Sequence, residues 1–204
     1  MIKRFCLLHH FILLPPHHQP YRARVRRSSS SRERRAQHIA RHLRDAKKRV
    51  VLADFRAARW ECGSKIEQLI HIGGLPSAIM MSGKSVIDET LPGFLGTYAG
   101  AASEPGVREA VESADALIAV GTFFFDLGTA GFSHKIDPRR FIDIQPFSAS
   151  VAGVRYPDVP MACALECVIE EIRHLDTRPT SFPAVGRKTP VSVGADEPLT
   201  QTNF

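Results

Sequence analysis

The sequence predicts an α/β fold built on a doubly wound, mostly parallel sheet with helices on both faces. Short apolar runs alternate along the chain with segments whose apolar residues recur at helical spacing, and this alternation is typical of crossover units. Ala116–Val120 is a continuous apolar run, as expected of a parallel strand covered on both faces. The helix before it begins at Pro105, because proline suits the first helical turn, and Val107, Val111 and Ala114 form its apolar face.

The other elements follow the same patterns. A helix is predicted from about Arg32 to Lys48, because Ile39, Leu43 and Ala46 share one face of it. The predicted strands are Arg49–Ala53, Ala78–Met81, Ala116–Val120 and Phe141–Gln145, with a short extended piece near Ser150–Tyr156. The further predicted helices are about Glu61–Ile72, Pro105–Ser113 and Met161–Leu175. The stretch that begins at Gly93 and precedes Pro105 is predicted to be a glycine-rich loop.

The charge of the chain is concentrated in its first quarter. The net charge is +6, but residues 1–50 hold 14 Lys and Arg against two acids, a formal +12, so residues 51–204 carry −6. A basic arm can contact nucleic acid or an anionic membrane surface, yet no recognised nucleic-acid module accompanies this one. No apolar run approaches the roughly 18 residues of a membrane span. We therefore expect neither nucleic acid nor membrane as a partner.

Met1–Ser31 is predicted to be a disordered basic leader. Phe5–Leu14 is a short apolar stretch, but histidines interrupt it and no small-residue cleavage site follows, which argues against a secretory signal. The Arg- and Ser-rich, acid-free composition resembles an organellar transit peptide, whereas a misplaced start codon or a frame disruption is the commoner explanation. The histidine pairs at residues 9–10 and 17–18 have no scaffold that fixes them, so we assign them no metal site.

The cysteines and the remaining histidine pair are not expected to bind metal. The four cysteines are Cys6, Cys62, Cys163 and Cys167. Cys163 and Cys167 lie one helical turn apart, but no further ligand follows with zinc-site spacing, and we expect them to be buried as small hydrophobes. His38 and His42 are expected to be solvated side chains beside an apolar stripe. The absence of a disulfide framework is typical of a reduced, cytoplasmic protein.

The candidate binding loops follow the carboxyl ends of the predicted strands, where ligands bind in such sheets. These loops are Asp54–Phe55, Gly83–Lys84, Thr122–Asp126 and Gln145–Phe147. The turn after Ala53 carries Gly63 alone, without the glycine pair that lets a pyrophosphate approach the backbone, so neither NAD nor FAD is expected. Lys84 is a candidate anion-binding residue, but we expect the aliphatic stem of its side chain to pack against the protein instead. Of Phe123–Phe125, at least one ring should face solvent or a partner.

Five blocks of sequence in fixed order resemble the central domain of thiamine-diphosphate-dependent 2-oxo-acid decarboxylases, most closely the indolepyruvate and phenylpyruvate decarboxylase type. The blocks are RVVLADF (Arg49–Phe55), MMSGKSVIDE (Met80–Glu89), Gly93–Phe132, FIDIQPFSASVAGV (Phe141–Val154) and VPMACALE (Val159–Glu166). The resemblance runs from Ala46 to about Leu175 and implies a Rossmann-like domain. Two departures stand out: Ser85 replaces a frequent glycine, and Phe123 or Phe124 replaces a polar or basic residue.

The resemblance implies thiamine diphosphate and Mg²⁺ as the cofactors of the full-length enzyme. In that family, an amino-terminal domain supplies an activating glutamate and a carboxyl-terminal domain binds the diphosphate through a Gly-Asp-Gly motif, which this sequence lacks. Four aspartates have a place within the central domain, and none of them matches a magnesium ligand of the family: Asp54, Asp88, Asp126 and Asp143. We therefore assign this chain no catalytic, cofactor-binding or metal-binding residue.

The predicted organisation is a leader over residues 1–31, the central domain over 32–175 and a linker over 176–204. The end of the linker, Glu197–Phe204, resembles the start of the catalytic domain, which is expected to be missing. One hypothesis is a fragment of a decarboxylase of aromatic or branched 2-oxo acids, inactive alone, whose partners are the other domains and subunits of a homo-oligomer. The alternative hypothesis is a free-standing Rossmann-like binding or regulatory module.

Overall fold

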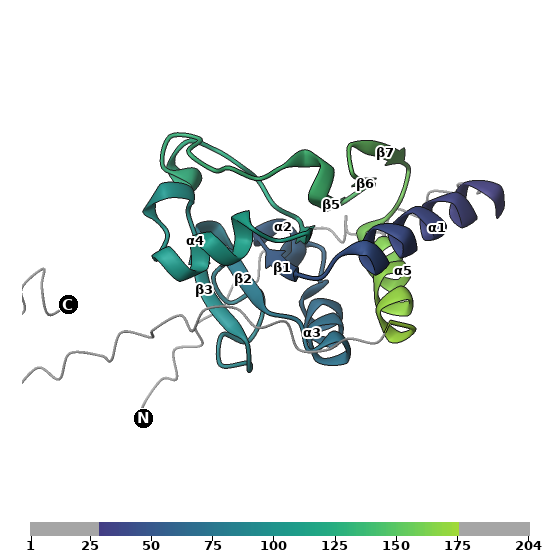
Figure 1. Ribbon diagram of the computed structural model, residues 1–204, viewed down its shortest axis with the longest axis horizontal. Coiled ribbons are helices and arrows are strands. Elements are labelled where there is room, and N and C mark those ends of the chain that lie inside the picture. The colour runs from purple at the N-terminus through teal and green to yellow at the C-terminus, as the bar shows by residue number, and fades with distance from the viewer. Residues whose placement is uncertain (1–28, 176–204) are drawn as a thin grey trace, which may run out of the picture.

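The computed structural model describes residues 29–175, with side chains from residue 32 onward, and contains one seven-stranded sheet (Figure 1). The strand order is β3-β2-β1-β4-β5-β6-β7. The strands are β1 (Arg49–Ala53), β2 (Ser77–Met80), β3 (Phe94–Tyr98), β4 (Ala116–Val120), β5 (Phe141–Gln145), β6 (Ser148–Val151) and β7 (Val154–Pro157). The strands β1 to β5 pair in parallel, and β6 and β7 are antiparallel. The predicted α/β class is confirmed. The predictions for residues 1–28 of the leader and for the linker lie outside the described residues, while the first helix begins at Ser29, inside the predicted leader.

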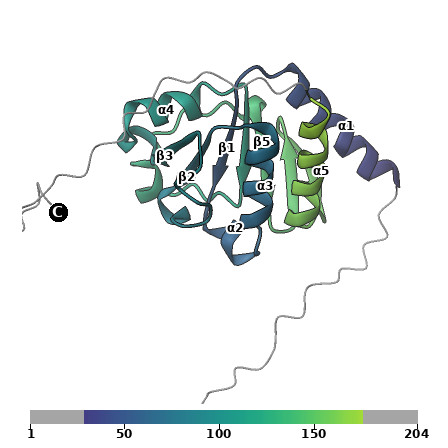
Figure 2. The same cartoon turned by 90° about the horizontal axis from the view of Figure 1, so that it is seen from below.

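Three helices cover what we call the first face of the sheet. They are α1 (Ser29–Asp45), α3 (Gly63–Gly73) and α5 (Met161–Arg173), and α5 packs between the other two (Figure 2). Each presents an apolar stripe to the strands, and fully buried residues such as Leu43, Ile66 and Leu165 join one large core. None of the helices over residues 29–175 is long and apolar enough to cross a membrane.

The second face carries a smaller core and, within residues 29–175, a single α-helix, α4 (Pro105–Glu112). Val107 and Val111 of α4 pack on buried strand residues that include Leu52 and Met80. The rest of this face is covered in part by the connection from residue 121 to residue 140, which contains only short 3₁₀ turns and packs Phe124 against the core. The second face is therefore closed by irregular backbone as well as by a helix.

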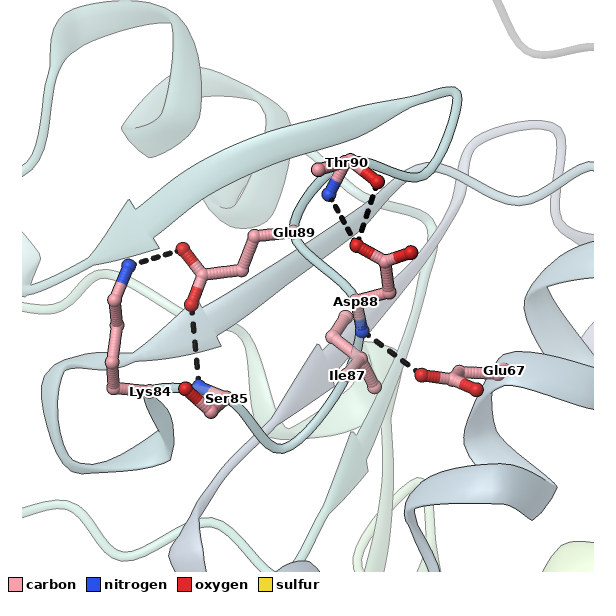
Figure 3. A pocket seen from close by; sticks show the side chains of 7 residues that line it. All are labelled: Glu67, Lys84, Ser85, Ile87, Asp88, Glu89 and Thr90. Carbon is pink, nitrogen blue, oxygen red and sulfur yellow. Dashed lines mark hydrogen bonds and ion pairs between the residues drawn. The ribbon is translucent and has the colours of Figure 1, made fainter.

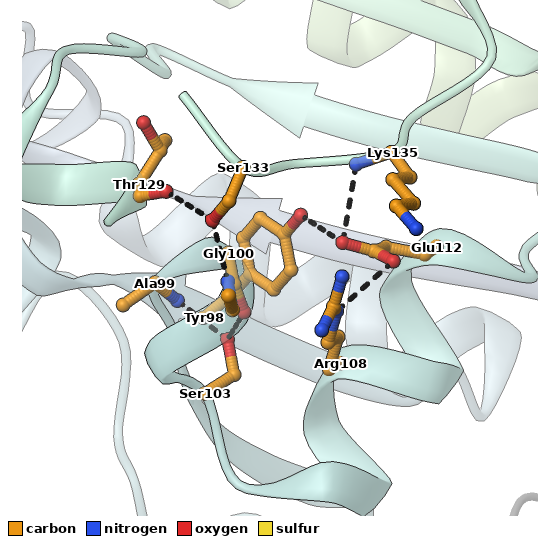
Figure 4. Close-up of polar contacts among 10 residues, drawn as sticks. Tyr98, Ala99, Gly100, Ser103, Arg108, Glu112, Thr129, Ser133 and Lys135 are labelled. Carbon is orange, nitrogen blue, oxygen red and sulfur yellow. Dashed lines mark hydrogen bonds and ion pairs between the residues drawn. The ribbon is translucent and has the colours of Figure 1, made fainter. Parts of the chain in front are cut away.

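A cluster of polar contacts fixes that connection to the sheet (Figure 4). The carboxylate of Glu112 accepts hydrogen bonds from the hydroxyl of Tyr98 at 2.9 Å, from Nε of Arg108 at 3.2 Å and from the backbone N–H of Lys135 at 3.1 Å. Burial, together with the carboxylate of Glu112, raises the pKa of Tyr98, so this hydroxyl stays a donor. Nearby, Ser133 accepts a hydrogen bond from the N–H of Ala101.

The structure corrects three details of the prediction. Phe94–Tyr98 is an edge strand and not a loop. Gly96 within it has a φ of +130°, beside a register shift between β2 and β3. A glycine inside a strand weakens the sequence pattern by which the strand is recognised. The helix predicted over about Glu61–Ile72 is α3, but the structure adds a short helix before it, α2 (Phe55–Arg59), which the prediction missed and which is separated from α3 where Glu61 has a φ of +52°. The extended piece near Ser150–Tyr156 is the β6–β7 hairpin, which adds an antiparallel end to the sheet.

Candidate functional site

The carboxylate of Asp54, at the end of β1, is fully buried and joins three loops of the carboxyl edge of the sheet. Its Oδ1 accepts hydrogen bonds from the N–H of Phe55 at 2.7 Å and from the hydroxyl of Ser82 at 2.7 Å. Its Oδ2 accepts one from the N–H of Phe123 at 2.9 Å. The loops that follow β1, β2 and β4 are therefore held together by one side chain, which caps α2 as well.

This arrangement supports the prediction that the turn after β1 does not admit a pyrophosphate. In dinucleotide-binding sheets the ligand's phosphates accept hydrogen bonds from N–H groups at the start of the helix after the first strand. Here the N–H groups of Phe55 and Phe123 already donate to Asp54. The loops also pack closely, because a Cβ on Gly83 would lie 2.7 Å from the carbonyl oxygen of Ala53.

A second polar group lies beside Asp54, on the second face at the end of β5. Nε2 of Gln145 donates to the carbonyl of Thr122 at 2.9 Å and to Oδ1 of Asp143 at 2.7 Å. Nη1 of Arg56 donates to Oε1 of Gln145 at 3.0 Å, and its guanidinium lies 4.6 Å from the ring centre of Phe123. Burial raises the pKa of Asp143, an effect that the hydrogen bond from Gln145 partly offsets.

Arg56 and Gln145 open onto a hollow of about 490 Å³. Its other lining residues are Trp60, Pro146, Phe147, Ser148, Arg155, Pro157 and Asp158. The rings of Trp60 and Phe147 meet edge to face, with 4.8 Å between their centres. The loops predicted at the ends of β1, β4 and β5 do meet at this place, and their chemistry is cationic and aromatic.

The fourth predicted loop, at Gly83–Lys84, faces a different hollow of about 560 Å³ (Figure 3). The prediction that Lys84 packs along its stem is wrong, because its side chain is 72% exposed and pairs with Glu89. Glu67 and Asp88 also line this hollow, so its surroundings are acidic and disfavour an anion. Ser85 adopts a φ of +64°, so serine keeps the left-handed backbone that a glycine would favour.

The predictions for cysteine and histidine are only partly right. Cys62 is buried, but Cys163 and Cys167 are each only partly buried, because they lie at the side of α5 and not at its centre. His38 is not a solvated side chain, since its Nδ1 lies 2.8 Å from the hydroxyl of Tyr156 in β7. Within residues 29–175 no group of three His, Cys, Asp or Glu residues is arranged to hold a metal ion.

The three phenylalanines after β4 have separate environments, which confirms that they do not all point inward. Phe123 is 44% exposed at the carboxyl edge. Phe124 turns to the second face, where its ring centre lies 4.8 Å from that of His134 and 6.1 Å from that of Phe141.

The sequence signal for the Asp54 contacts was an acid directly after a buried apolar run, but nothing in the sequence identified Ser82 and Phe123 as its partners.

Comparison with known proteins finds a match between residues 36–172 and the family model described as thiamine pyrophosphate enzyme, central domain. An alpha-keto-acid decarboxylase of Mycolicibacterium paratuberculosis is 37% identical over 153 residues, which are 74% of this chain and 27% of that protein. One of Mycobacterium tuberculosis is 39% identical over 153 residues, with the same coverage. A pyruvate decarboxylase of Aspergillus terreus is 35% identical over 141 residues, 69% of this chain and 25% of that protein.

The chain thus spans about a quarter of the length of these relatives. The matched part coincides with the sheet and the helices that cover it, and the loops that meet at Asp54 lie inside it. The relatives are named for alpha-keto acids and for pyruvate, so the likeness to the indolepyruvate and phenylpyruvate type stays a prediction.

Proposed function

The chain belongs to the thiamine pyrophosphate enzyme family as its central domain, and we propose that it is part of a decarboxylase that releases CO₂ from aromatic or branched 2-oxo acids. The observation that carries this proposal is the 37% to 39% identity with alpha-keto-acid decarboxylases over 74% of the chain. We further propose that its partners are the other domains and subunits of that enzyme, in the cytoplasm. The aromatic or branched substrate rests on the sequence resemblance alone.

The described residues do not themselves fit thiamine pyrophosphate, which is the same compound as thiamine diphosphate. The cofactor supplies the electron sink for decarboxylation, and Mg²⁺ holds its diphosphate through nearly octahedral oxygen ligands. Over residues 29–175 no cluster of candidate metal ligands is present, and the backbone N–H groups at the end of β1 and β4 donate to Asp54. We therefore propose that this chain is inactive alone and serves as the rigid central scaffold of the enzyme.

A chimeric enzyme tests the proposal. Residues 36–172 replace the corresponding segment of the M. tuberculosis alpha-keto-acid decarboxylase, and the parental enzyme is the control. We expect the chimera to release CO₂ from 2-oxo acids in the presence of thiamine diphosphate and Mg²⁺, because the segment supplies spacing and not chemistry. The 204-residue chain alone should leave the uncatalysed rate unchanged. Activity of the chain alone that EDTA removes and Mg²⁺ restores would contradict the scaffold role.

The flanking DNA tests the alternative, a free-standing binding or regulatory module. A reading frame that encodes a glutamate-bearing domain upstream and a Gly-Asp-Gly domain downstream supports the decarboxylase. The product of that frame can then be assayed with indolepyruvate, phenylpyruvate, branched 2-oxo acids and pyruvate, and a preference for pyruvate would refute the proposed substrate class. Flanks that encode neither domain, together with a functional promoter, would favour the module.

A further inference from the structure

The outer side of α1 concentrates positive charge. α1 lies at one end of the molecule and packs mainly against α5 and β6, where Ile39 and Leu43 are buried, so its opposite side faces solvent (Figure 2). The exposed acids of residues 32–48 are Glu33 and Asp45, which leaves an excess of four positive charges. Six exposed cationic residues lie on the helix and in the turn after it: Arg32, Arg34, Arg41, Arg44, Lys47 and Lys48.

Three of these residues form a line along the helix, which we call the arginine face: Arg34, Arg41 and Arg44. Arg41 follows Arg34 by seven residues, which is close to two turns, and Arg44 follows Arg41 by three, so the three side chains leave one side of α1. They span about 15 Å along the helix axis, at roughly 1.5 Å per residue. No ion pair among the described residues involves any of the three, so no carboxylate of the described chain neutralises them at contact distance.

The arginine face is held in a fixed position on the molecule. Nε of the buried Arg49 donates to the carbonyl of Leu43 at 2.8 Å, and Oδ2 of Asp115 accepts from the N–H of Lys48 at 3.1 Å, so the carboxyl end of α1 is fastened to the sheet. Farther along α1, Nδ1 of His38 lies 2.8 Å from the hydroxyl of Tyr156. A partner therefore has to order only the arginine side chains and not the helix, which lowers the entropic cost of binding.

A partner of the arginine face must be recognised by charge, because α1 offers it no apolar contact. Among the described residues, none of the exposed large apolar side chains lies on α1, whose apolar stripe is buried in the first core. Protein interfaces depend on large apolar or aromatic anchors at their centre, and a helix that binds in a membrane surface inserts an apolar face. The phosphates of nucleic acid form charge-assisted, often bidentate hydrogen bonds with arginine and require neither.

We propose that the arginine face binds the phosphate backbone of double-stranded nucleic acid, without reading the bases. A duplex carries one negative charge about every 1.7 Å of its axis, so it presents several phosphates over the length of the face. α1 contains no Phe, Tyr or Trp on which an unpaired base could stack, which favours a duplex over a single strand.

The distribution of charge along the chain supports this proposal. Residues 1–31, which directly precede the face, hold six Lys and Arg and no acid, whereas residues 51–204 carry −6. The acidic part of the chain repels a duplex, so association through the basic end is favoured. The sequence contains no recognised nucleic-acid module, which is why no such partner was expected, but backbone binding requires only positioned cations.

Fluorescence anisotropy of a labelled duplex of mixed sequence, titrated with the full 204-residue chain at several salt concentrations, tests the proposal. We expect the affinity to fall as the salt concentration rises, because each phosphate contact releases counterions. The triple variant Arg34→Gln, Arg41→Gln, Arg44→Gln should weaken binding at low salt at least about tenfold. It should also reduce the slope of log K against log salt by roughly 2–3, at about 0.9 for each lost contact. Glutamine is a good helix former, and circular dichroism verifies that the variant folds.

A second triple variant, Arg59→Gln, Lys84→Gln, Lys135→Gln, is the matched control. It changes the net charge by the same amount at three exposed positions that lie outside α1. We expect its affinity to change by less than about twofold, because charges far from the contact are screened by salt. An equal loss in the two triple variants would mean that net charge and not the arginine face controls binding, and would overturn the proposal.

Three further results would also overturn it: no binding at low salt, unchanged binding by the arginine-face variant, or tighter binding to a single strand of the same length than to the duplex. Sedimentation with vesicles of phosphatidylcholine and phosphatidylserine adds a comparison, in which we expect weaker binding than to the duplex. A preference for the vesicles would assign the face to an anionic membrane instead. None of these measurements involves decarboxylase activity, so they are independent of the proposed function.

Discussion

Three helices, α1, α3 and α5, cover the first face of the sheet, whereas the second face has α4 and the irregular connection of residues 121–140. The first face is closed by interlocking apolar side chains that come from helices with their own hydrogen bonds. The second face needs polar contacts, such as those of Glu112, to hold its connection in place. The comparison indicates that the same sheet is stabilised mainly by burial on one side and by burial plus specific hydrogen bonds on the other.

The largest expected effect compares two neighbours on β2 that point to opposite faces. Ile79 belongs to the first core and Met80 to the second, and both are fully buried. Each change to alanine should lower the free energy of unfolding by about 2–5 kcal/mol, with Ile79→Ala the more costly, because packed helices relax around a cavity less than an irregular connection does. Urea unfolding of the two variants measures the difference. Equal losses would show that the two faces are equally rigid.

A smaller effect compares one carboxylate on each face. Glu112→Gln should cost about 1–3 kcal/mol, because the neutral amide gives up charge-assisted hydrogen bonds to Tyr98 and Arg108 at a mostly buried position. Glu166→Gln, which breaks an exposed pair with Lys65 between α5 and α3, should cost about 0–1 kcal/mol.

Hydrogen exchange adds a local measurement to this pair of variants. Glu112→Gln should speed the exchange of amides in residues 121–140 and leave those of α5 unchanged, because the hydrogen bond from the N–H of Lys135 to Glu112 fixes the connection, whereas α5 packs on the first face. Faster exchange on both faces would mean that the connection is not an independent unit.

A pH-dependent effect is expected from Asp143 on the second face. Burial raises its folded-state pKa above the ordinary value of 3.8, so the folded state holds the proton more tightly than the unfolded chain does. This contribution to stability is present below that ordinary value and is lost as the pH rises through the raised pKa. Asp143→Asn should therefore make the protein slightly more stable at neutral pH. It should also make the free energy of unfolding depend less on pH in this range. Urea midpoints between acidic and neutral pH test it, and a variant less stable than the parent at neutral pH would contradict it.

His38 on α1 should give the smallest effect, with the opposite sign of pH dependence. Burial, with His42 and Arg41 nearby, lowers its pKa below the ordinary 6.5, so the folded state disfavours its proton. Its contribution is present above pH 6.5 and is lost as the pH falls through the lowered pKa. His38→Gln keeps a hydrogen-bonding side chain opposite Tyr156 and should remove the loss of stability that occurs as the pH falls. Exchange rates of α1 amides at neutral and mildly acidic pH measure it; an unchanged acid loss in the variant would exclude His38 as the cause.

The central strands could be predicted from the sequence, and the edges could not. The predicted bounds of β1, β4 and β5 agree with the structure, because a strand buried inside a parallel sheet is a continuous or alternating apolar run. The edge strand β3 was missed because Gly96 interrupts its apolar pattern and Gly93 directly precedes it. α2 was missed because a single turn capped by Asp54 has too few residues to show a helical period.

The candidate site was predictable only as a set of loops. Sheet topology brings the carboxyl ends of β1, β2 and β4 to one edge, so the meeting of these loops follows from the fold class. The partners of Asp54 do not, because Ser82 lies 28 residues away along the chain and Phe123 lies 69 away. Which hydrogen bonds form over such separations depends on register and loop path, and neither leaves a local pattern in the sequence.

The antiparallel β6–β7 hairpin has a consequence for aggregation. An edge strand with free N–H and C=O groups is a template on which further strands can polymerise into fibrils. Here the outermost strand β7 has only four residues and ends in Pro157, which has no N–H to donate, and Arg155 places a charge in its middle. Amyloid-like growth from this end of the sheet is therefore disfavoured. At high protein concentration, strands of other molecules should not pair with β7.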